Sequence, residues 1–148
     1  IKTFKIKIVA MAKDIFHQQV KKALIKDGWI ITDDPLTLRI SEPIKVQIEL
    51  AAENAIAAER DTEKIAVEIK SFIAGSDISE FHTALGQYLN YVQALEEHEP
   101  ERIVYLAVPE ETYKDFFQLT FVQRTIKRYQ MKLIVYEPNK EEIISWIK

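Results

Sequence analysis

A carboxylate and an ammonium group lie two residues apart in an otherwise apolar segment, residues 65–72, IAVEIKSF. Side chains alternate across a strand, so Glu68 and Lys70 project from one face while Val67 and Ile69 project from the other. A buried or half-buried charge is costly unless a partner or a metal compensates it. A carboxylate that binds a divalent cation, beside a lysine that orients water or stabilises phosphate charge, is the E-x-K half of metal-dependent nuclease sites. The other interpretation is a solvated strand face.

A nuclease site of the D…(D/E)-x-K type needs a second acid, because Mg²⁺ is usually held by one or two carboxylates with waters and phosphate oxygens. Glu49 and Glu53 are the candidates. Glu49 lies in the alternating segment VQIEL and precedes the E-x-K strand by a separation comparable to that in such nucleases. Its extra methylene relative to aspartate would shift a bound metal and weaken catalysis. We therefore expect the metal ligands to come from Glu49, Glu53 and Glu68.

Two polar residues on a predicted helix extend this candidate site. Gln87 and Tyr91 are four residues apart and therefore share one helical face, where an amide and a phenol can hydrogen-bond a carboxylate, a lysine or a phosphate. Several nuclease families carry such a pair on the helix after the E-x-K strand, although the pair alone is commonplace on amphipathic helices. The predicted catalytic set is Glu49, Glu68, Lys70, Gln87 and Tyr91.

Other chemistries are disfavoured. The three histidines, of which only His82 is expected near the proposed site, show no i, i+4 metal-binding pair. No serine lies in a G-x-S-x-G setting, and the absence of cysteine excludes disulfides and thiolate sites. The larger aromatic residues are expected in the core rather than on a base-stacking platform; they are Tyr105, Phe116, Phe117, Phe121, Tyr129 and Trp146.

The first half of the chain has the sequence pattern of one helix followed by short strands. Apolar residues recur at helical spacing over 11–27, and Asp27-Gly28 supplies the stop. Extended segments are predicted over 29–32, 37–40 and 44–50. Residues 54–59 and 64–72 are expected to pair as a hairpin across 60–63, with a helix over 51–60 as the alternative.

The second half alternates long helices with buried strands. Asp77 followed by Glu80 resembles a capping box, and Phe81, Leu85, Leu89 and Val92 would form the buried stripe of a helix ending near residue 97. Apolar runs over 102–108 and 132–136 predict strands, and 113–129 is helical in pattern. Helices between late strands imply crossover connections. The predicted fold is α/β, a mixed β-sheet flanked by helices.

The length and composition of the chain limit the classes of protein to which it can belong. The 148 residues, 47% of them hydrophobic, suffice for a single domain. The net charge is −3, but residues 1–26 carry seven lysines against one aspartate. This basic end could steer a polyanion or be a solvated helix face, and a dedicated DNA-binding protein would usually be basic overall. No apolar run approaches the ~18 residues of a spanning helix. We expect a cytoplasmic protein without membrane contact.

Five segments together resemble the XisH family: residues 11–17 (MAKDIFH), 22–29 (KALIKDGW), 65–72 (IAVEIKSF), 81–91 (FHTALGQYLNY) and 132–136 (KLIVY). The resemblance spans residues 11–148. Family members usually begin at the position of Met11, so residues 1–10 are expected to be an upstream extension of a single XisH-like domain. The resemblance implies a restriction-endonuclease-like fold, in agreement with the predicted order of elements.

The resemblance also implies a function. The family is known from cyanobacteria as a controlling factor for excision of the fdxN DNA element, acting with the recombinase XisF and the companion protein XisI. Where family members tend to carry aspartate, this chain has Glu49. We expect an XisH-like controlling factor for DNA element excision on a nuclease-like scaffold, with an XisI-like partner and with DNA and further copies of the chain as candidate contacts. The alternative is an active Mg²⁺-dependent DNA endonuclease.

Overall fold

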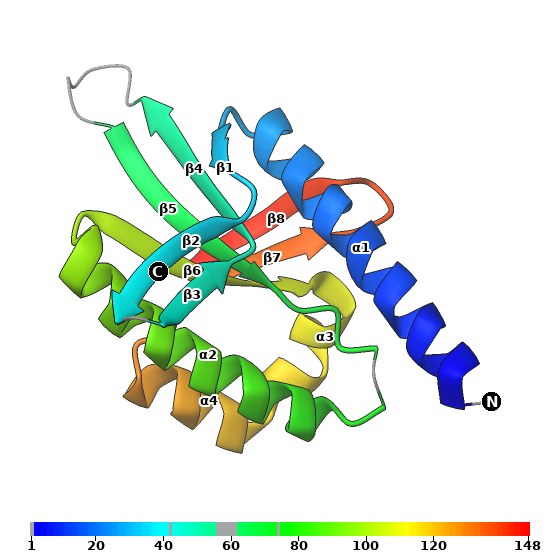
Figure 1. Cartoon of the computed structure of the whole chain (residues 1–148). Coiled ribbons are helices and arrows are strands. Elements are labelled where there is room, and N and C mark those ends of the chain that lie inside the picture. The colour runs from blue at the N-terminus through cyan, green and yellow to red at the C-terminus, as the bar shows by residue number, and fades with distance from the viewer. Residues whose placement is uncertain (1, 42, 56–61, 74) are drawn as a thin grey trace.

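The computed structural model describes residues 2–41, 43–55, 62–73 and 75–148. Its helices are α1 (Lys2–Lys26), α2 (Asp77–His98), α3 (Glu110–Lys114) and α4 (Thr120–Arg128), with a 3₁₀ turn η1 (Phe116–Gln118) between the last two (Figure 1). The strands are β1 (Ile30–Asp33), β2 (Leu36–Ser41), β3 (Ile44–Ile48), β4 (Leu50–Ala55), β5 (Thr62–Ile69), β6 (Arg102–Pro109), β7 (Leu133–Glu137) and β8 (Glu142–Ile147). None of the helices in these ranges is long and apolar enough to cross a membrane.

A six-stranded mixed sheet organises the molecule, in the order β1-β4-β5-β6-β7-β8. The central strands β5, β6 and β7 run parallel, because α2 connects the first pair and α3 with α4 connects the second. The outer pairs are antiparallel. Strands β2 and β3 form a separate two-stranded hairpin. The predicted α/β class with a mixed sheet flanked by helices is confirmed.

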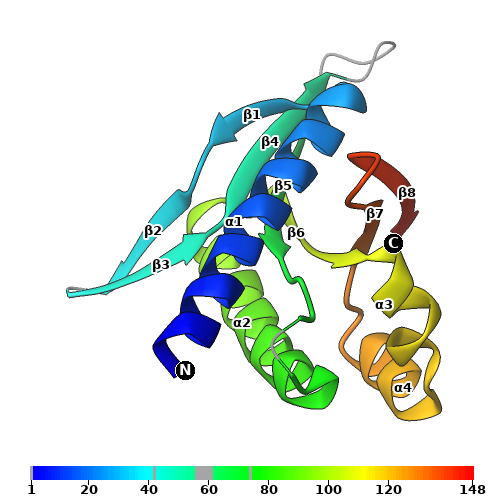
Figure 2. The same cartoon turned by 90° about the vertical axis from the view of Figure 1, so that its right-hand side faces the viewer.

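The central strands are buried on both faces, so their sequences are almost continuously apolar. Along β5, Ile65 and Val67 join α1 in one core cluster, whereas Ala66 joins α2 in the other. The β2–β3 hairpin, η1 and α4 pack into the same cluster as α2. Figure 1 shows α1 and α2 on opposite sides of the central strands, and Figure 2 shows α1 in front of the sheet. By alternation Glu68 points to the α2 side, as Ala66 does.

The predicted hairpin is confirmed, with its first strand shifted. β4 pairs antiparallel with β5 from Leu50 opposite Val67 to Ala55 opposite Thr62. The alternative helix is wrong for residues 51–55; residues 56–61, with the start of the predicted turn, lie outside the described residues. Glu49 is not a strand residue, because the chain bends there between β3 and β4.

Two details predicted for α2 are wrong. The N-cap is Ser76, whose side chain accepts a hydrogen bond from the Ser79 amide, so Asp77 lies inside the first turn. The buried stripe is also rotated: Leu89 is exposed, and the residues of this helix that are buried are Phe81, Ala84, Tyr88, Tyr91, Ala94 and Leu95. The two tyrosines and two alanines of this stripe belong to the core cluster that also contains residues of the β2–β3 hairpin and β6.

The C-terminal part differs from the prediction in three ways. The predicted helix over 113–129 is broken into α3, η1 and α4. The last strand, β8, was not predicted, because its pattern is half-buried and charged at its start. Phe121 and Tyr129 are exposed rather than part of the core, whereas Tyr105, Phe116 and Phe117 are buried as predicted.

Candidate functional site

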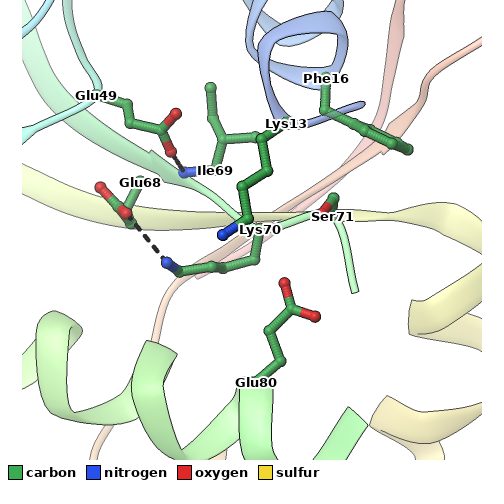
Figure 3. Close-up of a pocket in the computed structure, with 8 residues that line it drawn as sticks. All are labelled: Lys13, Phe16, Glu49, Glu68, Ile69, Lys70, Ser71 and Glu80. Carbon is green, nitrogen blue, oxygen red and sulfur yellow. Dashed lines mark hydrogen bonds and ion pairs between the residues drawn. The ribbon is translucent and has the colours of Figure 1, made fainter. Parts of the chain in front are cut away.

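A cavity of about 200 Å³ lies at the carboxyl end of β5, where α1, the β3–β4 bend and the first turns of α2 converge (Figure 3). Three elements distant in sequence therefore contribute to it. Its lining residues are Lys13, Phe16, Glu49, Glu68, Ile69, Lys70, Ser71 and Glu80.

Glu68 and Lys70 form the ion pair at the centre of this cavity. The Lys70 ammonium lies 3.3 Å from Glu68 Oε2, on the side of the sheet that faces α2. The Lys70 amide donates to the Ala107 carbonyl, 3.0 Å away, which continues the β5–β6 pairing past the end of β5. Glu68 is only 6% exposed, and its second oxygen, Oε1, has no hydrogen-bond partner among the described residues.

Burial changes the protonation of Glu68. Desolvation raises the pKa of its carboxyl from 4.5 to about 7, and the nearby negative charge of Glu49 acts in the same direction. The charge and hydrogen bond of Lys70 offset part of this rise. Near neutral pH the carboxyl is therefore present in both protonation states.

Glu49 joins the end of β5 to α1. Its Oε2 accepts a hydrogen bond of 2.8 Å from the Ile69 amide, and its Oε1 is hydrogen-bonded to His17 Nδ1 at 3.1 Å. The bend at Glu49 makes this possible, because in the β4–β5 register the residue continues the ladder to a position opposite Glu68. The Glu49 carboxylate is thus held beside Glu68.

His17 was missed by the sequence analysis, which discounted histidines and placed only His82 near the site. His17 bridges two carboxylates, since its Nε2 also lies 2.8 Å from Asp34 Oδ1. A protonated imidazole donates at both nitrogens and would satisfy both carboxylates at once. His82 is exposed on α2. Only the tertiary contact identifies His17, because nothing in the local sequence distinguishes it.

Asp34 completes a chain of polar contacts from α1 to the cavity. Lys21 Nζ lies 2.7 Å from Asp34 Oδ2. Burial raises the pKa of Asp34, but the hydrogen bonds and charges of Lys21 and His17 outweigh it, so the pKa lies below its usual value. The contacts run from Lys21 through Asp34 and His17 to Glu49, which fixes α1 against the site.

The two predicted helix residues differ in their relation to the site. Tyr91 is buried, and its pKa is raised well above the usual value by desolvation and by the negative charges of Glu68 and Glu49. Its phenol therefore lies close enough to sense both carboxylates. Gln87 does not line the cavity, and its buried Oε1 has no hydrogen-bond partner within the described ranges.

Glu53 is not brought to the site. It lies opposite Lys64 in the β4–β5 register, towards the other end of both strands. Its carboxylate is 4.0 Å from Lys64 Nζ and 3.8 Å from the Arg102 guanidinium. The predicted set of three acidic ligands is therefore not assembled.

Glu80 and Ser71 supply polar atoms that the sequence analysis did not assign to the site. Glu80 Oε1 accepts a hydrogen bond of 3.1 Å from the Phe72 amide, which holds Phe72 in the left-handed region at φ 55°. Glu80 Oε2 and the Ser71 hydroxyl are buried without a hydrogen-bond partner in the part of the chain that the structure describes. The spacing of Glu80 from Asp77 suggested helix capping, which concealed this contact.

The donor set defines which metal the cavity suits. No group of three or more histidine, aspartate or glutamate side chains within the described ranges could together hold an ion. Mg²⁺, however, is commonly held by one or two carboxylates and by phosphate oxygens and waters. Glu49 and Glu68 fit that requirement, because Glu68 Oε1 lacks a partner and each carboxylate oxygen of Glu49 retains a free lone pair.

The comparisons with known proteins agree with one another. The sequence model of the family described as XisH protein matches residues 10–144. No curated protein matches the chain. The crystal structure of an XisH family protein from Nostoc punctiforme is 51% identical, covers 90% of this chain and 99% of its own, and superposes with a TM-score of 0.81.

A second crystal structure is equally similar. It is that of an fdxN element excision controlling factor protein from Anabaena variabilis, with 51% identity, coverage of 91% of this chain and 99% of its own, and a TM-score of 0.81. Both solved structures thus share the α/β arrangement described above. The family match extends over nearly the whole chain, and the chain belongs to the XisH family.

Proposed function

We propose that this chain is a controlling factor for the excision of a DNA element. The observation that carries the proposal is the 51% identity, across 91% of the chain, to the Anabaena variabilis protein described as an fdxN element excision controlling factor. Identity at this level over the full fold makes a shared role the simplest inference. Because a fold alone does not fix a function, the details of that role are argued from the site.

The scaffold of this role is nuclease-like. A first acid at the β3–β4 bend, an E-x-K pair at the end of the next long strand and a helix behind it are the arrangement of D…(D/E)-x-K nucleases. Glu49, however, stands where such nucleases carry aspartate, and its carboxylate is hydrogen-bonded to the Ile69 amide and to His17. These features favour control of excision over strand cleavage as the task of the chain.

An XisI-like companion protein is part of this proposal. Co-expression of the two proteins, followed by affinity capture of one and light scattering of the product, tests the association. A complex with a defined mass supports the proposal. Recovery of the two proteins as separate species at micromolar concentration would contradict the companion's part in it.

A second candidate function is Mg²⁺-dependent cleavage of DNA. The observation that favours it is the unpartnered Oε1 of Glu68, next to Glu49 and within an ion pair with Lys70. Glu49 and Glu68 would hold the ion, which would supply Lewis-acid stabilisation of phosphate charge when bound. Lys70 would position a water at the phosphate, and Tyr91 would hold the acids from the α2 side.

Plasmid nicking by the purified chain, with and without its companion, separates the two candidates. The reaction contains Mg²⁺ or Mn²⁺ and compares wild type with Glu68→Gln and Lys70→Met, using Glu53→Gln as the matched acid outside the cavity. Cleavage by wild type and Glu53→Gln but by neither site variant would establish the endonuclease. Equal background in all four samples would exclude it and leave the controlling role.

A further inference from the structure

Helix α4 presents a basic face with an exposed aromatic ring. Val122 and Ile126 are buried against the core, which fixes the orientation of the helix. Its outward stripe consists of positions i, i+3, i+4 and i+7, and the same side chains border a shallow surface depression. The stripe residues are Phe121, Arg124, Thr125 and Arg128.

The positive charge of this region is not compensated locally. Residues 116–136 contain four cations and no acid, so within a net charge of −3 this segment is +4 and the remaining chain is −7. Arg124, Lys127 and Arg128 have no ion-pair partner within the described ranges. Two lysines of α1 differ, because Lys21 lies 2.7 Å from Asp34 and Lys22 lies 3.3 Å from Glu141.

The helix dipole explains only part of this pattern. Cations in the last turn, such as Lys127 and Arg128, are favoured by the partial negative charge of a helix C-terminus. Arg124 lies in the middle of α4, where that effect is small. Phe121 is 65% exposed on the same stripe, where burial cannot account for it. The stripe therefore has features that stability of the helix does not require.

The chemistry of the stripe fits a phosphodiester backbone. A guanidinium presents a fork of donors that matches phosphate oxygens, and Arg124 and Arg128 are one turn apart, about 6 Å along the helix axis. The Thr125 hydroxyl between them donates to the Phe121 carbonyl, so the two guanidinium groups are the phosphate donors of the stripe. An exposed aromatic ring beside arginines can stack on an unpaired base. A neighbouring acid would repel phosphate, and the sequence of this segment contains none.

We propose that the outer face of α4 is a DNA-docking surface, with Arg124 and Arg128 on phosphates and Phe121 stacking on an unpaired base. This surface rests on the proposed role in DNA element excision and assigns to it the region that contacts DNA. It is separate from the residues that line the cavity at the end of β5. In the basic N-terminal segment, for which the sequence left open a polyanion or a solvated helix face, Lys21 and Lys22 are paired with Asp34 and Glu141 from other parts of the chain.

Fluorescence anisotropy of labelled 30-mer DNA, single-stranded and double-stranded, tests this surface with the full chain. The test variant is Arg124→Ala/Arg128→Ala, and the matched control is Lys22→Ala/Lys114→Ala. The control removes two cations with exposed side chains, 62% and 71%, that pair with Glu141 and Glu110. Both variants change the net charge by the same amount, so a general charge effect would weaken them equally.

The test variant is expected to lose about tenfold or more in affinity for double-stranded DNA at 100 mM salt, while the control loses about twofold or less. The slope of log K against log salt should fall by about 1.8 for the test variant, which corresponds to two phosphate contacts. Phe121→Ala should weaken binding of single strands more than of duplex. Thermal melts of each variant verify that the fold is retained.

Equal affinities of the test and control variants would overturn the proposal. Unchanged DNA affinity together with lost capture of the XisI-like companion would overturn it as well, because the face would then bind protein. The proposed function is tested separately, by excision frequency in the same variants. If the test variant loses DNA binding but excision is undiminished, α4 is still a DNA-docking surface, but that surface is not needed for excision.

Discussion

At the scale of single residues, the protonation of Glu68 is the property that determines what the cavity can do. A carboxyl whose pKa is raised to about 7 by burial and by Glu49 is an unfavourable anion in the absence of a cation. Lys70 supplies one positive charge at 3.3 Å, which is not enough to return the pKa to its usual value. The cavity therefore attracts either a proton or a further cation.

This raised pKa predicts a pH dependence of stability. Between about pH 4.5 and 7 the folded chain retains a proton that the unfolded chain has released, so Glu68 lowers stability as the pH rises through this window. Glu68→Gln removes the effect. The stability of the variant relative to wild type should increase by on the order of 2–3 kcal/mol between pH 5 and pH 8. Urea unfolding at both pH values measures it.

Parallel pH profiles of wild type and Glu68→Gln would contradict that prediction. Glu53→Gln serves as the control, since Glu53 lies beside Lys64 and Arg102 rather than beside another acid. Its profile should follow that of wild type across the same range.

Lys70→Met should remove the cation that is paired with Glu68, whose carboxyl lies beside that of Glu49. We expect the variant to be destabilised at pH 7 by on the order of 1–3 kcal/mol. Millimolar Mg²⁺ should restore part of the loss by supplying positive charge. Lys114→Met is the control, because its exposed pair with Glu110 contributes little. Thermal melts of wild type and both variants, with and without Mg²⁺, measure the effect. If Lys70→Met melts at the wild-type temperature in both conditions, the cavity holds no charge cluster.

At the scale of elements, α1 is fixed to the sheet by a polar bridge as well as by apolar packing. His17 on α1 contacts both Asp34, which precedes β2, and Glu49, at the β3–β4 bend. Removing the imidazole leaves two carboxylates without this partner. His17→Ala should lower the free energy of unfolding by on the order of 1–3 kcal/mol, whereas His82→Ala, at an exposed position of α2, should change it by less than about 0.5 kcal/mol.

Chemical denaturation of these two histidine variants provides the measurement. If His17→Ala is as stable as His82→Ala, the bridge contributes nothing to the docking of α1. A fall in stability for His17→Ala alone would show that the contact of His17 with Glu49 and Asp34 helps to fix α1.

The elements were predictable where a single periodicity dominates. The apolar runs of β6 and β7 and the pairing of β4 with β5 follow from alternation and from breaker residues. The buried face of α2 could not be placed, because tyrosines and alanines face the sheet there while Leu89 is exposed. β8 was missed because its half-buried pattern resembles a polar terminus.

The site was predictable only where its residues are close in sequence. Glu68 and Lys70 share a face because they are two apart near the end of one strand. Whether Glu49 or Glu53 is the second acid of the site depends on the β4–β5 pairing register. This register puts Glu53 opposite Lys64, whereas Glu49, at the bend, accepts a hydrogen bond from the Ile69 amide. Glu80 and Lys13 line the cavity and His17 contacts its residue Glu49, from two helices whose packing the sequence does not specify.

At the scale of the whole molecule, one compact sheet carries two separate chemical surfaces. The cavity at the end of β5 contains three acids and two lysines, of which Glu68 and Lys70 form an ion pair, whereas α4 carries cations with no ion-pair partner among the described residues. The DNA-docking face proposed for α4 is therefore separate from the cavity. The chain belongs to the XisH family, and one of its solved relatives is described as an fdxN element excision controlling factor.

The most direct test of this account is the frequency of excised junctions in a reporter that carries an fdxN-type element, the recombinase XisF and the XisI-like companion. Quantitative PCR compares cells with no chain, wild type and Lys70→Met. A controlling factor predicts that excision rises at least about tenfold with wild type, roughly the 1.4 kcal/mol of one decade, and that folded Lys70→Met retains the increase. Equal junction frequencies with and without the chain would contradict the controlling role, and a folded Lys70→Met variant that behaves like the empty control would show that excision requires the cavity residue Lys70.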